Sequence, residues 1–490
     1  MNRTSVIAKG ILDLSSLREI FGSWSRASFH RRFPDLRPFD PPGRSEVDKV
    51  EWLNDLASTM VFAGQDLKKS EENPRIPAGY TYFGQFLAHD LVMTARGPDH
   101  AGVDGSESIN VRDRGLGLEA LYGGGPEVAP SLYERNGSGR FLVGGREDPL
   151  LRQALEERPR PLRFPRRPAD VDLARNHQGV ALIADPRNDF TTMIAQMQLC
   201  LMLVHNKLVT RHRGRKDPFA SARQSLTWHY QWVIVFDYLR RILDEDRWRI
   251  LDDAVQGLRK TTRAMRLSRT GARRTLPVEL VAAAFRFGHS MVRPSYALND
   301  RIRDRVALVP ASTAVPPTEH LLGLRWLPED WTIDWRYFLD VQGRTQDPRM
   351  QSSKRIEPRV TMRLASLPRE MLPPGVNLSL PLITLMRGWM WGLPSGQDVA
   401  QALGFPPSGR DPEPLWVYVL REAKEAHRGE RLGPVCSSLV LESFWQVLVT
   451  DPSSFLVQDP SWQPEIESGG KPFRLLDLLD HADLEAPKRN

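Results

Sequence analysis

The chain of 490 residues has only two cysteines, Cys200 and Cys436, and no long apolar run. Two thiols cannot build a disulfide framework or a cysteine-rich zinc site, and they favour a reducing compartment. No stretch reaches the roughly 18 consecutive apolar residues that a membrane-spanning helix needs. Charged residues interrupt the first 26 positions, where a signal peptide would be apolar. These absences predict a soluble, cytoplasmic protein with no transmembrane segment.

A large excess of charge of one sign is also missing. The chain has 67 basic and 60 acidic residues, a net charge of +7 spread over its whole length. Proteins that bind nucleic acid concentrate Lys and Arg on one face and place stacking aromatic residues among them. The one candidate stretch, residues 259–274, contains no aromatic residue. We therefore expect no nucleic-acid partner, and we interpret this stretch as a solvated surface.

Motifs for several common chemistries are absent. The chain has no Walker loop, no GxSxG elbow, no HExxH and no GxGxxG after a strand, which argues against nucleotide, esterase and zinc-protease chemistry. The alternation typical of strands is scarce, whereas helical periodicity recurs. Helices are therefore expected at residues 190–210, 222–243, 278–292, 382–390 and 432–448, with a short one capped by Ser395 and ending near Gly404. The first, with Asp189 as its N-cap, is expected to be a buried central helix.

These patterns predict a mainly α fold with long loops and little β structure. No repeat of 20–50 residues and no clear linker divides the chain, so one large helical domain is the simplest organisation. We place this domain at residues 31–480, after an N-terminal extension of residues 1–30 and before a tail of residues 481–490.

Two groups of polar residues interrupt the apolar patterns in the first 190 residues. Gln85 and His89 lie four residues apart and share a helix face, which suits a general acid-base, although a hydrogen-bonded core histidine gives the same pattern. Arg187 stands where the most apolar helix begins, and the positive end of a helix dipole does not stabilise a cation. Its partner is therefore an anion or a developing negative charge, or else a carboxylate in an ordinary salt bridge.

A third polar group, Arg286 and His289, follows the small residues 282–284. The two side chains are three residues apart and share a helix face. Gly288 leaves room beside His289 for a bulky planar group, so the imidazole could ligate the metal of a large cofactor. A packed core histidine is the alternative interpretation.

Together these segments resemble the animal-type haem peroxidases of the peroxidase-cyclooxygenase superfamily, especially bacterial-type members. The similarity rests on residues 76–86 leading to His89 and Asp90, on residues 185–189 and 286–289, and on Arg387-Gly388 followed by residues 392–397. Shorter matches occur at residues 33–36, 121–123, 429–435 and 451–456. In order and spacing they cover residues 30–480, which implies a single, mostly α-helical haem domain.

The resemblance assigns His289 as the axial ligand of the haem iron, on what we call the proximal side. Its other ring nitrogen would need a hydrogen-bond acceptor that raises the basicity of the ligand. Thr384 stands at the family's asparagine position and could accept this proton over a shorter reach. Arg286 and Arg387 would lie near the haem propionates or on the proximal side.

The resemblance places the peroxide chemistry on the opposite, distal side. His89 would take a proton from the bound peroxide oxygen and deliver it to the departing oxygen. Arg187 would stabilise the negative charge that grows as the O–O bond breaks, and Gln85 would hold a water.

Departures from the family pattern restrict the chemistry. Ala88 and Phe190 stand where acidic residues form esters to haem in mammalian members, and Thr191 replaces a methionine that forms a further bond. We therefore expect noncovalently bound haem b and no production of hypochlorous acid. Cyclooxygenases carry a radical-forming tyrosine at the position of Arg286, so radical oxygenation by that route is disfavoured.

The family's calcium site is altered as well. It uses the Asp after the distal histidine, here Asp90, and a loop in which Gly117 replaces one ligand. Asp113 and Glu119 could supply oxygen ligands, which calcium prefers.

The sequence thus predicts a haem peroxidase that reduces hydrogen peroxide, oxidises a small organic electron donor and acts in the response to oxidative stress. One alternative is a haem-binding protein with little turnover, such as a sensor or scaffold. Another is a biosynthetic haem oxidase or oxygenase on the same fold.

Overall fold

The structure, a computed structural model, describes residues 23–24, 28–95, 107–112, 115–147, 169–260, 275–310, 319–341, 347–365 and 379–487. Asp113 and most of the basic stretch at residues 259–274 lie outside these ranges. Within them, no helix combines the length and the apolar character needed to cross a bilayer.

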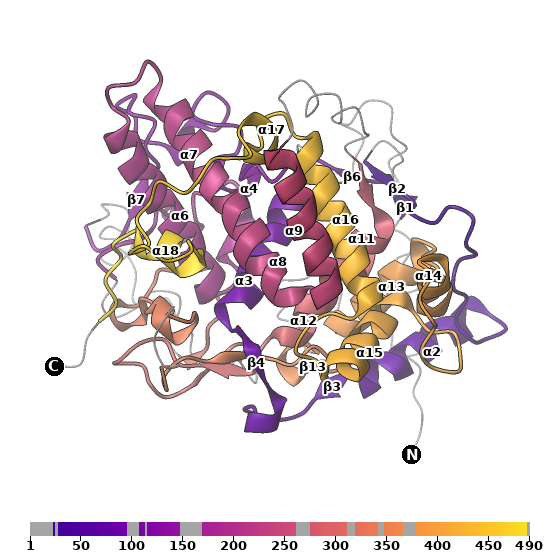
Figure 1. Ribbon diagram of the computed structural model, residues 1–490. Coiled ribbons are helices and arrows are strands. Elements are labelled where there is room, and N and C mark those ends of the chain that lie inside the picture. Colours follow the sequence, from indigo (N-terminus) through magenta and orange to yellow (C-terminus); the bar gives the residue numbers. More distant parts are fainter. Residues whose placement is uncertain are drawn as a thin grey trace.

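Helices far outweigh strands in the described residues, which confirms the predicted mainly α class (Figure 1). The longer ones are α2 (Glu46–Thr59), α3 (Gly79–Leu91), α6 (Thr192–Arg211), α7 (Pro218–Val233), α9 (Glu245–Arg259), α13 (Leu380–Met390), α15 (Leu415–His427) and α16 (Pro434–Thr450). The shorter ones are α4 (Glu119–Tyr122), α8 (Leu239–Ile242), α11 (Val278–Ala282), α12 (Gly288–Met291), α14 (Gly396–Ala402), α17 (Phe455–Gln458) and α18 (Leu475–Asp480).

Short strands tie together segments that are far apart in the sequence. The two-stranded pairs are β2 (Phe29–His30) with β9 (Leu276–Pro277), β3 (Val61–Phe62) with β13 (Val360–Thr361), β4 (Glu72–Pro77) with β12 (Ser352–Lys354), β7 (Val143–Gly144) with β8 (Asp172–Leu173), and β10 (Ser295–Tyr296) with β11 (Val306–Ala307). A three-stranded sheet has the order β1 (Ser23–Trp24), β6 (Glu107–Asn110), β5 (Thr94–Ala95). Through β1 and β2, parts of the predicted N-terminal extension take part in the fold.

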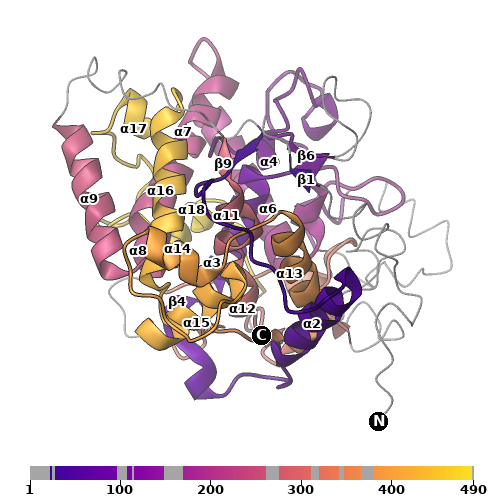
Figure 2. The same cartoon turned by 90° about the vertical axis from the view of Figure 1, so that its right-hand side faces the viewer.

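The core centres on α6, which is buried along most of its length, as its apolar sequence predicts. It packs against α3, α7 and α18. At the other end of the molecule, α2 and α13 contact each other and lie side by side in both views (Figures 1 and 2).

Two helix boundaries differ from the prediction in instructive ways. Asp189 is not the N-cap of α6: that residue is Thr191, and Asp189 ends the 3₁₀ turn η3 (Pro186–Asp189). The carboxylate of Asp189 instead accepts two hydrogen bonds from Arg175, at 2.6 and 2.7 Å. The second helix begins earlier than predicted, at Pro218, because Asp217 caps it through the amide of Ala220.

The predicted continuous helix at residues 278–292 is wrong. The chain leaves helical geometry at Ala283, with φ −136° and ψ −68°, so α11, the 3₁₀ turn η5 (Ala284–Phe287) and α12 are separate. Side chains bind the carbonyl groups that a continuous helix would pair internally: Arg286 Nε donates to Val281 O at 2.9 Å, and Trp416 Nε1 donates to Arg286 O at 3.2 Å. The break gives His289 a short helix of its own.

Candidate functional site

One stripe of α3 remains partly exposed although the helix runs through the core. The partly exposed residues are Gly84, Gln85, Ala88 and His89, which recur at helical spacing, whereas their neighbours Phe86 and Leu87 are fully buried. The stripe is therefore the side of α3 that other side chains do not cover completely. Gln85 and His89 share this face, as the sequence predicts.

The imidazole of His89 is held by an amide from a distant loop. Its Nδ1 lies 2.7 Å from Oδ1 of Asn188, which is fully buried. Burial and the positive charge of Arg187 lower the pKa of His89 from 6.5 to about 4. The ring is therefore neutral near pH 7 and can accept a proton.

Arg187 is bound by a carboxylate and by the C-terminal end of α3. Its Nε and Nη2 donate to the two oxygens of Asp185 at 2.9 and 2.6 Å. Nη2 also donates to the carbonyl oxygens of His89 and Val92 at 3.1 and 2.9 Å. The sequence left open whether Arg187 pairs with a carboxylate or with another anion, and the structure shows the salt bridge to Asp185. Nη1 has no partner in the described part of the protein.

A second arginine shares this carboxylate. Arg112 donates to Asp185 through Nη2 and to the carbonyl oxygen of His89 through Nε, the latter at 3.2 Å. Burial alone would raise the pKa of Asp185, but the hydrogen bonds and charge of Arg187, together with the charge of Arg112, hold it at about 2. We call Arg112, Asp185 and Arg187 the distal clamp, because together they fix the loop before α6 to the end of α3.

His289 lies on α12, which packs against α3. Its Nδ1 is buried and has no hydrogen-bond partner among the residues that the structure describes. The hydroxyl of Thr384 donates to Leu380 O at 2.9 Å, so the structure does not show it serving as the predicted acceptor for His289. Burial, Arg286 and Arg387 lower the pKa of His289 from 6.5 to about 3, which leaves the ring neutral.

Open space lies beside His289. A Cβ atom added to Gly288 would meet no other atom within 4 Å. Small residues thus leave room at this position, as the sequence predicts for a bulky planar group.

Three arginines converge on the same region. Burial lowers the pKa of Arg286 well below 12.5, and the positive charges of Arg387 and Arg187 lower it further. The positive charges of Arg387, on the proximal side, and of Arg187, on the distal side, therefore both act on Arg286. Such a concentration of cations in a buried region suits an anionic ligand.

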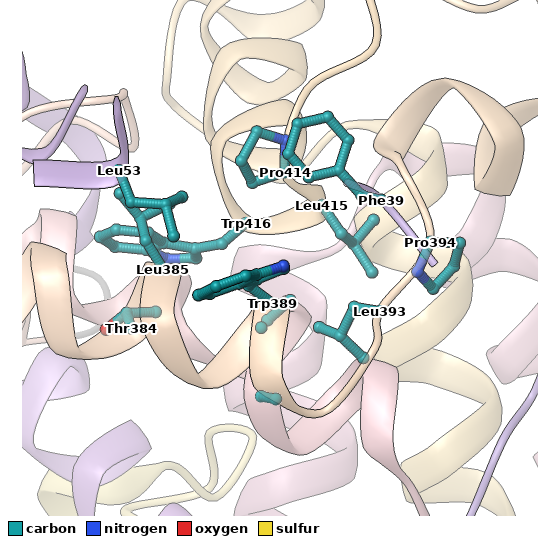
Figure 3. Close-up of a pocket in the computed structure, with 13 residues that line it drawn as sticks. Phe39, Leu53, Thr384, Leu385, Trp389, Leu393, Pro394, Pro414, Leu415 and Trp416 are labelled. Atoms are coloured by element: carbon teal, nitrogen blue, oxygen red, sulfur yellow. The ribbon is translucent and has the colours of Figure 1, made fainter. Parts of the chain in front are cut away.

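A small apolar pocket lies behind the proximal side (Figure 3). The indole of Trp389 lies across it, and Thr384 and Trp416 are among its lining residues. The pocket encloses about 20 Å³. A cavity that holds benzene measures roughly 150 Å³, so this one is too small for an aromatic substrate and belongs to the packing around the break at Ala283.

A sequence family model supplies the assignment. The model described as animal haem peroxidase matches residues 104–408. The chain belongs to the animal haem peroxidase family. The matched segment of this haem peroxidase family member contains Arg187 and His289, whereas His89 precedes it.

Solved structures with the same fold include both peroxidases and dioxygenases. Peroxidase A from Dictyostelium discoideum aligns with a TM-score of 0.55 and 14% identity, covering 91% of this chain and 92% of that one. Fatty acid alpha-dioxygenase from Arabidopsis thaliana has a TM-score of 0.54 and 12% identity, covering 96% and 80%. A fatty acid alpha-dioxygenase from Oryza sativa with palmitic acid has 0.56 and 12%, covering 91% and 85%. Among curated proteins, no sequence matches the chain.

Two of the acidic residues predicted to bind calcium in this haem peroxidase family member, Asp90 and Glu119, have other contacts. Asp90 accepts hydrogen bonds from the amides of Leu118 and Ala120, at 3.1 and 3.0 Å, and from the hydroxyl of Tyr230. Glu119 pairs with Arg223 at 3.8 Å. The described residues contain no cluster of three His, Cys, Asp or Glu that could hold a metal ion. Asp90 thus anchors the turn before α4.

Sequence reasoning missed three partners in the candidate site. Asn188 and Asp185 lie inside the quoted motif but carry no signal of their contacts, and Arg112 lies in no motif at all. Their partners are brought together by tertiary folding, so residue spacing does not reveal them.

Proposed function

We propose that the protein is a peroxidase that reduces hydrogen peroxide and oxidises a small organic electron donor, with haem b bound noncovalently. The observation that carries this proposal is a pair of histidines on α3 and α12, two helices that pack against each other. A neutral, hydrogen-bonded His89 lies on one helix, and a neutral His289, whose Nδ1 has no hydrogen-bond partner among the described residues, lies on the other, with three arginines near them.

The residues present fit a haem group. Gly288 leaves open space beside His289, and Arg286 and Arg387 provide positive charge for the two propionates of haem. The imidazole of His289 would hold the haem iron. Ala88 and Phe190 cannot form esters, which supports noncovalent binding. When bound, haem would supply the redox-active iron at which peroxide is reduced.

The remaining chemistry would belong to the side chains of the distal side. Because Nδ1 of His89 is engaged by Asn188, its Nε2 is the atom that would accept a proton from hydrogen peroxide and return it to the departing oxygen. The free Nη1 of Arg187 would stabilise the negative charge on that oxygen. Gln85, one turn earlier on the same stripe, would hold a water beside His89.

The test is an absorption spectrum of purified, haem-loaded protein before and after one equivalent of peroxide. We expect a Soret band that disappears in His289→Ala and changes rapidly on adding peroxide. A His289→Ala variant that keeps the same Soret band would contradict the axial role. Donor oxidation that survives in His89→Ala at the wild-type rate would contradict the acid-base role.

A second candidate is a haem-binding protein with little turnover, and one feature on each side of the site favours it. Nδ1 of His289 has no acceptor to increase the basicity of the ligand, and two nitrogens of Arg187 are already bound to Asp185. A Soret band that persists unchanged after stoichiometric peroxide would support this candidate over the peroxidase.

A fatty acid oxygenase is disfavoured, although two of the structural neighbours are alpha-dioxygenases. Arg286 stands where the resemblance places a radical-forming tyrosine in cyclooxygenases. Oxygen uptake on adding palmitic acid to the haem-loaded protein would revive this function.

A further inference from the structure

We infer that Asn188, backed by Gln198, is a positioning residue that determines which ring nitrogen of His89 carries the proton. This inference rests on the proposed function, because it concerns the histidine assigned there to acid-base work. It adds two residues that have no assigned role.

The contacts form a short polar chain from the core to the candidate site. Oδ1 of Asn188 lies 2.7 Å from Nδ1 of His89, and Nδ2 of Asn188 donates to Oε1 of Gln198 at 3.0 Å. Gln198 lies on α6 and, like Asn188, is almost completely buried. The amide of Asn188 therefore presents its nitrogen to Gln198 and its oxygen to the imidazole.

An amide oxygen only accepts hydrogen bonds, so Nδ1 of His89 must carry a hydrogen. In a neutral ring the lone pair is then on Nε2, the nitrogen that Asn188 does not engage. This is the form that can take a proton. When Nε2 is protonated, the bond from Nδ1 to Asn188 becomes charge-assisted and persists through the transfer.

The loop that carries Asn188 is fixed on both sides. Arg187, the residue before it, is bound to Asp185, and Asp189, the residue after it, is bound to Arg175. Both ion pairs are largely buried. The turn η3 thus cannot shift its amide without breaking two charge-assisted pairs, and the direction of Oδ1 is defined before any ligand binds.

One donor of this polar chain has no hydrogen-bond partner among the described residues. Nε2 of Gln198 is buried without a hydrogen-bond partner. Gln198 therefore leaves a donor unsatisfied while its oxygen holds Asn188, and such donors are rare in folded proteins. If the side-chain amides of Asn188 and Gln198 were both rotated by a half turn, Nε2 of Gln198 would donate to Asn188. The nitrogen of Asn188 would then donate to Nδ1 of His89, so Nε2 of His89 would carry the hydrogen and could not accept a proton. The two arrangements make opposite predictions for the ring.

The first measurement uses the haem-free protein, so it does not depend on turnover. Histidine labelled with ¹⁵N, with His89 assigned by comparison with His89→Gln, reports the protonated nitrogen directly. We expect Nδ1–H in the wild type and a mixture of both tautomers in Asn188→Leu, which has a similar volume and no acceptor. Asn188→Asp keeps an acceptor oxygen and should restore Nδ1–H.

The second measurement is the rate at which peroxide changes the Soret band of haem-loaded protein. Asn188→Leu should react about 10- to 100-fold more slowly, the usual effect of losing an outer hydrogen-bond partner at a metal site. Asn188→Asp should stay within about tenfold of the wild type. The matched control is Asn206→Leu, because Asn206 is an equally buried amide on α6 that bonds Phe141 instead.

The inference is overturned by Nε2–H in wild-type protein, or by an Asn188→Leu variant that keeps both the wild-type tautomer and the wild-type rate. Circular dichroism separates a folding failure from these outcomes, and Asn188→Asp then decides. If the tautomers behave as expected while no variant, including the wild type, reacts with peroxide, the positioning role stands and the proposed peroxidase function fails.

Discussion

The distal and proximal sides of the site differ in how their polar groups are satisfied. On the distal side, His89, Asn188 and Arg187 all have hydrogen-bond partners, and Asp185 joins two arginines. On the proximal side, Nδ1 of His289 is buried without a partner, and the side chain of Arg286 bonds a backbone carbonyl rather than a carboxylate. The distal side is therefore held together by the protein's own side chains, whereas on the proximal side Arg286 pairs with no carboxylate among the described residues.

The largest effect on the distal side is expected from removing His89, the proposed base. His89→Ala should lower the rate of peroxide reduction by about 100- to 10,000-fold while leaving the Soret band in place, because a positioned acid-base contributes that much. Stopped-flow absorption measures the rate. Equal loss of the Soret band would show that His89 holds haem rather than protons.

Removing the carboxylate of the distal clamp tests whether the protein's own ion pairs hold the distal side in place. Asp185→Ala leaves Arg112 buried and Arg187 largely buried without their shared carboxylate, so the free energy of unfolding should fall by about 3–5 kcal/mol, measured by urea denaturation of haem-free protein. The control is Asp40→Ala, which breaks an exposed pair with Lys49 and should change stability by about 1 kcal/mol or less. Similar losses in both variants would contradict the clamp.

The proximal side should respond in the opposite sense. Arg286→Met removes a largely buried cation that pairs with no carboxylate among the described residues, so the haem-free protein should be unchanged or more stable by about 1 kcal/mol. The same change should weaken haem binding by about tenfold, because one propionate would lose its partner. Thermal unfolding with and without haem measures both effects. If Arg286→Met lowered the stability of the haem-free protein, an anion would have to lie near Arg286 in the absence of haem.

The smallest expected effect is a shift in pH dependence. Because burial and Arg187 depress the pKa of His89 to about 4, its base form should persist as pH falls from 7 and should be half lost near pH 4. An ordinary histidine would lose half of its base near pH 6.5. The rate of the peroxide reaction between pH 4 and 7 distinguishes the two. A midpoint near pH 6.5 would mean that burial and Arg187 do not lower the pKa of His89.

Residue spacing along the chain predicted features within single helices, and it missed contacts between segments that are far apart in the sequence. It identified the face that Gln85 and His89 share, because helical periodicity determines it. It also identified the cap of α14, where Ser395 accepts from the amide of Asp398. It could not reveal that Asn188 would meet His89, since the two residues are joined only through packing between α3 and the loop before α6.

A tertiary contact also overrode a local preference. Residues 278–292 have an uninterrupted helical pattern, yet the indole of Trp416, which lies far along the chain, binds the carbonyl oxygen of Arg286 that a continuous helix would need. The hydroxyl of Thr384, by contrast, follows a local rule, because it donates to Leu380 O one turn back in its own helix.

The strand pairs have a consequence for how the molecule is made. β4, which leads directly into α3, pairs with β12, and β2 pairs with β9, so early segments wait for partners from much later in the chain. During synthesis, at roughly 5–20 residues per second, α3 emerges from the ribosome long before β12 can hold it. Contacts of such long sequence separation fold slowly. The nascent chain therefore carries an apolar helix with its distal histidine unsupported, and this interval is when the protein is most exposed to aggregation.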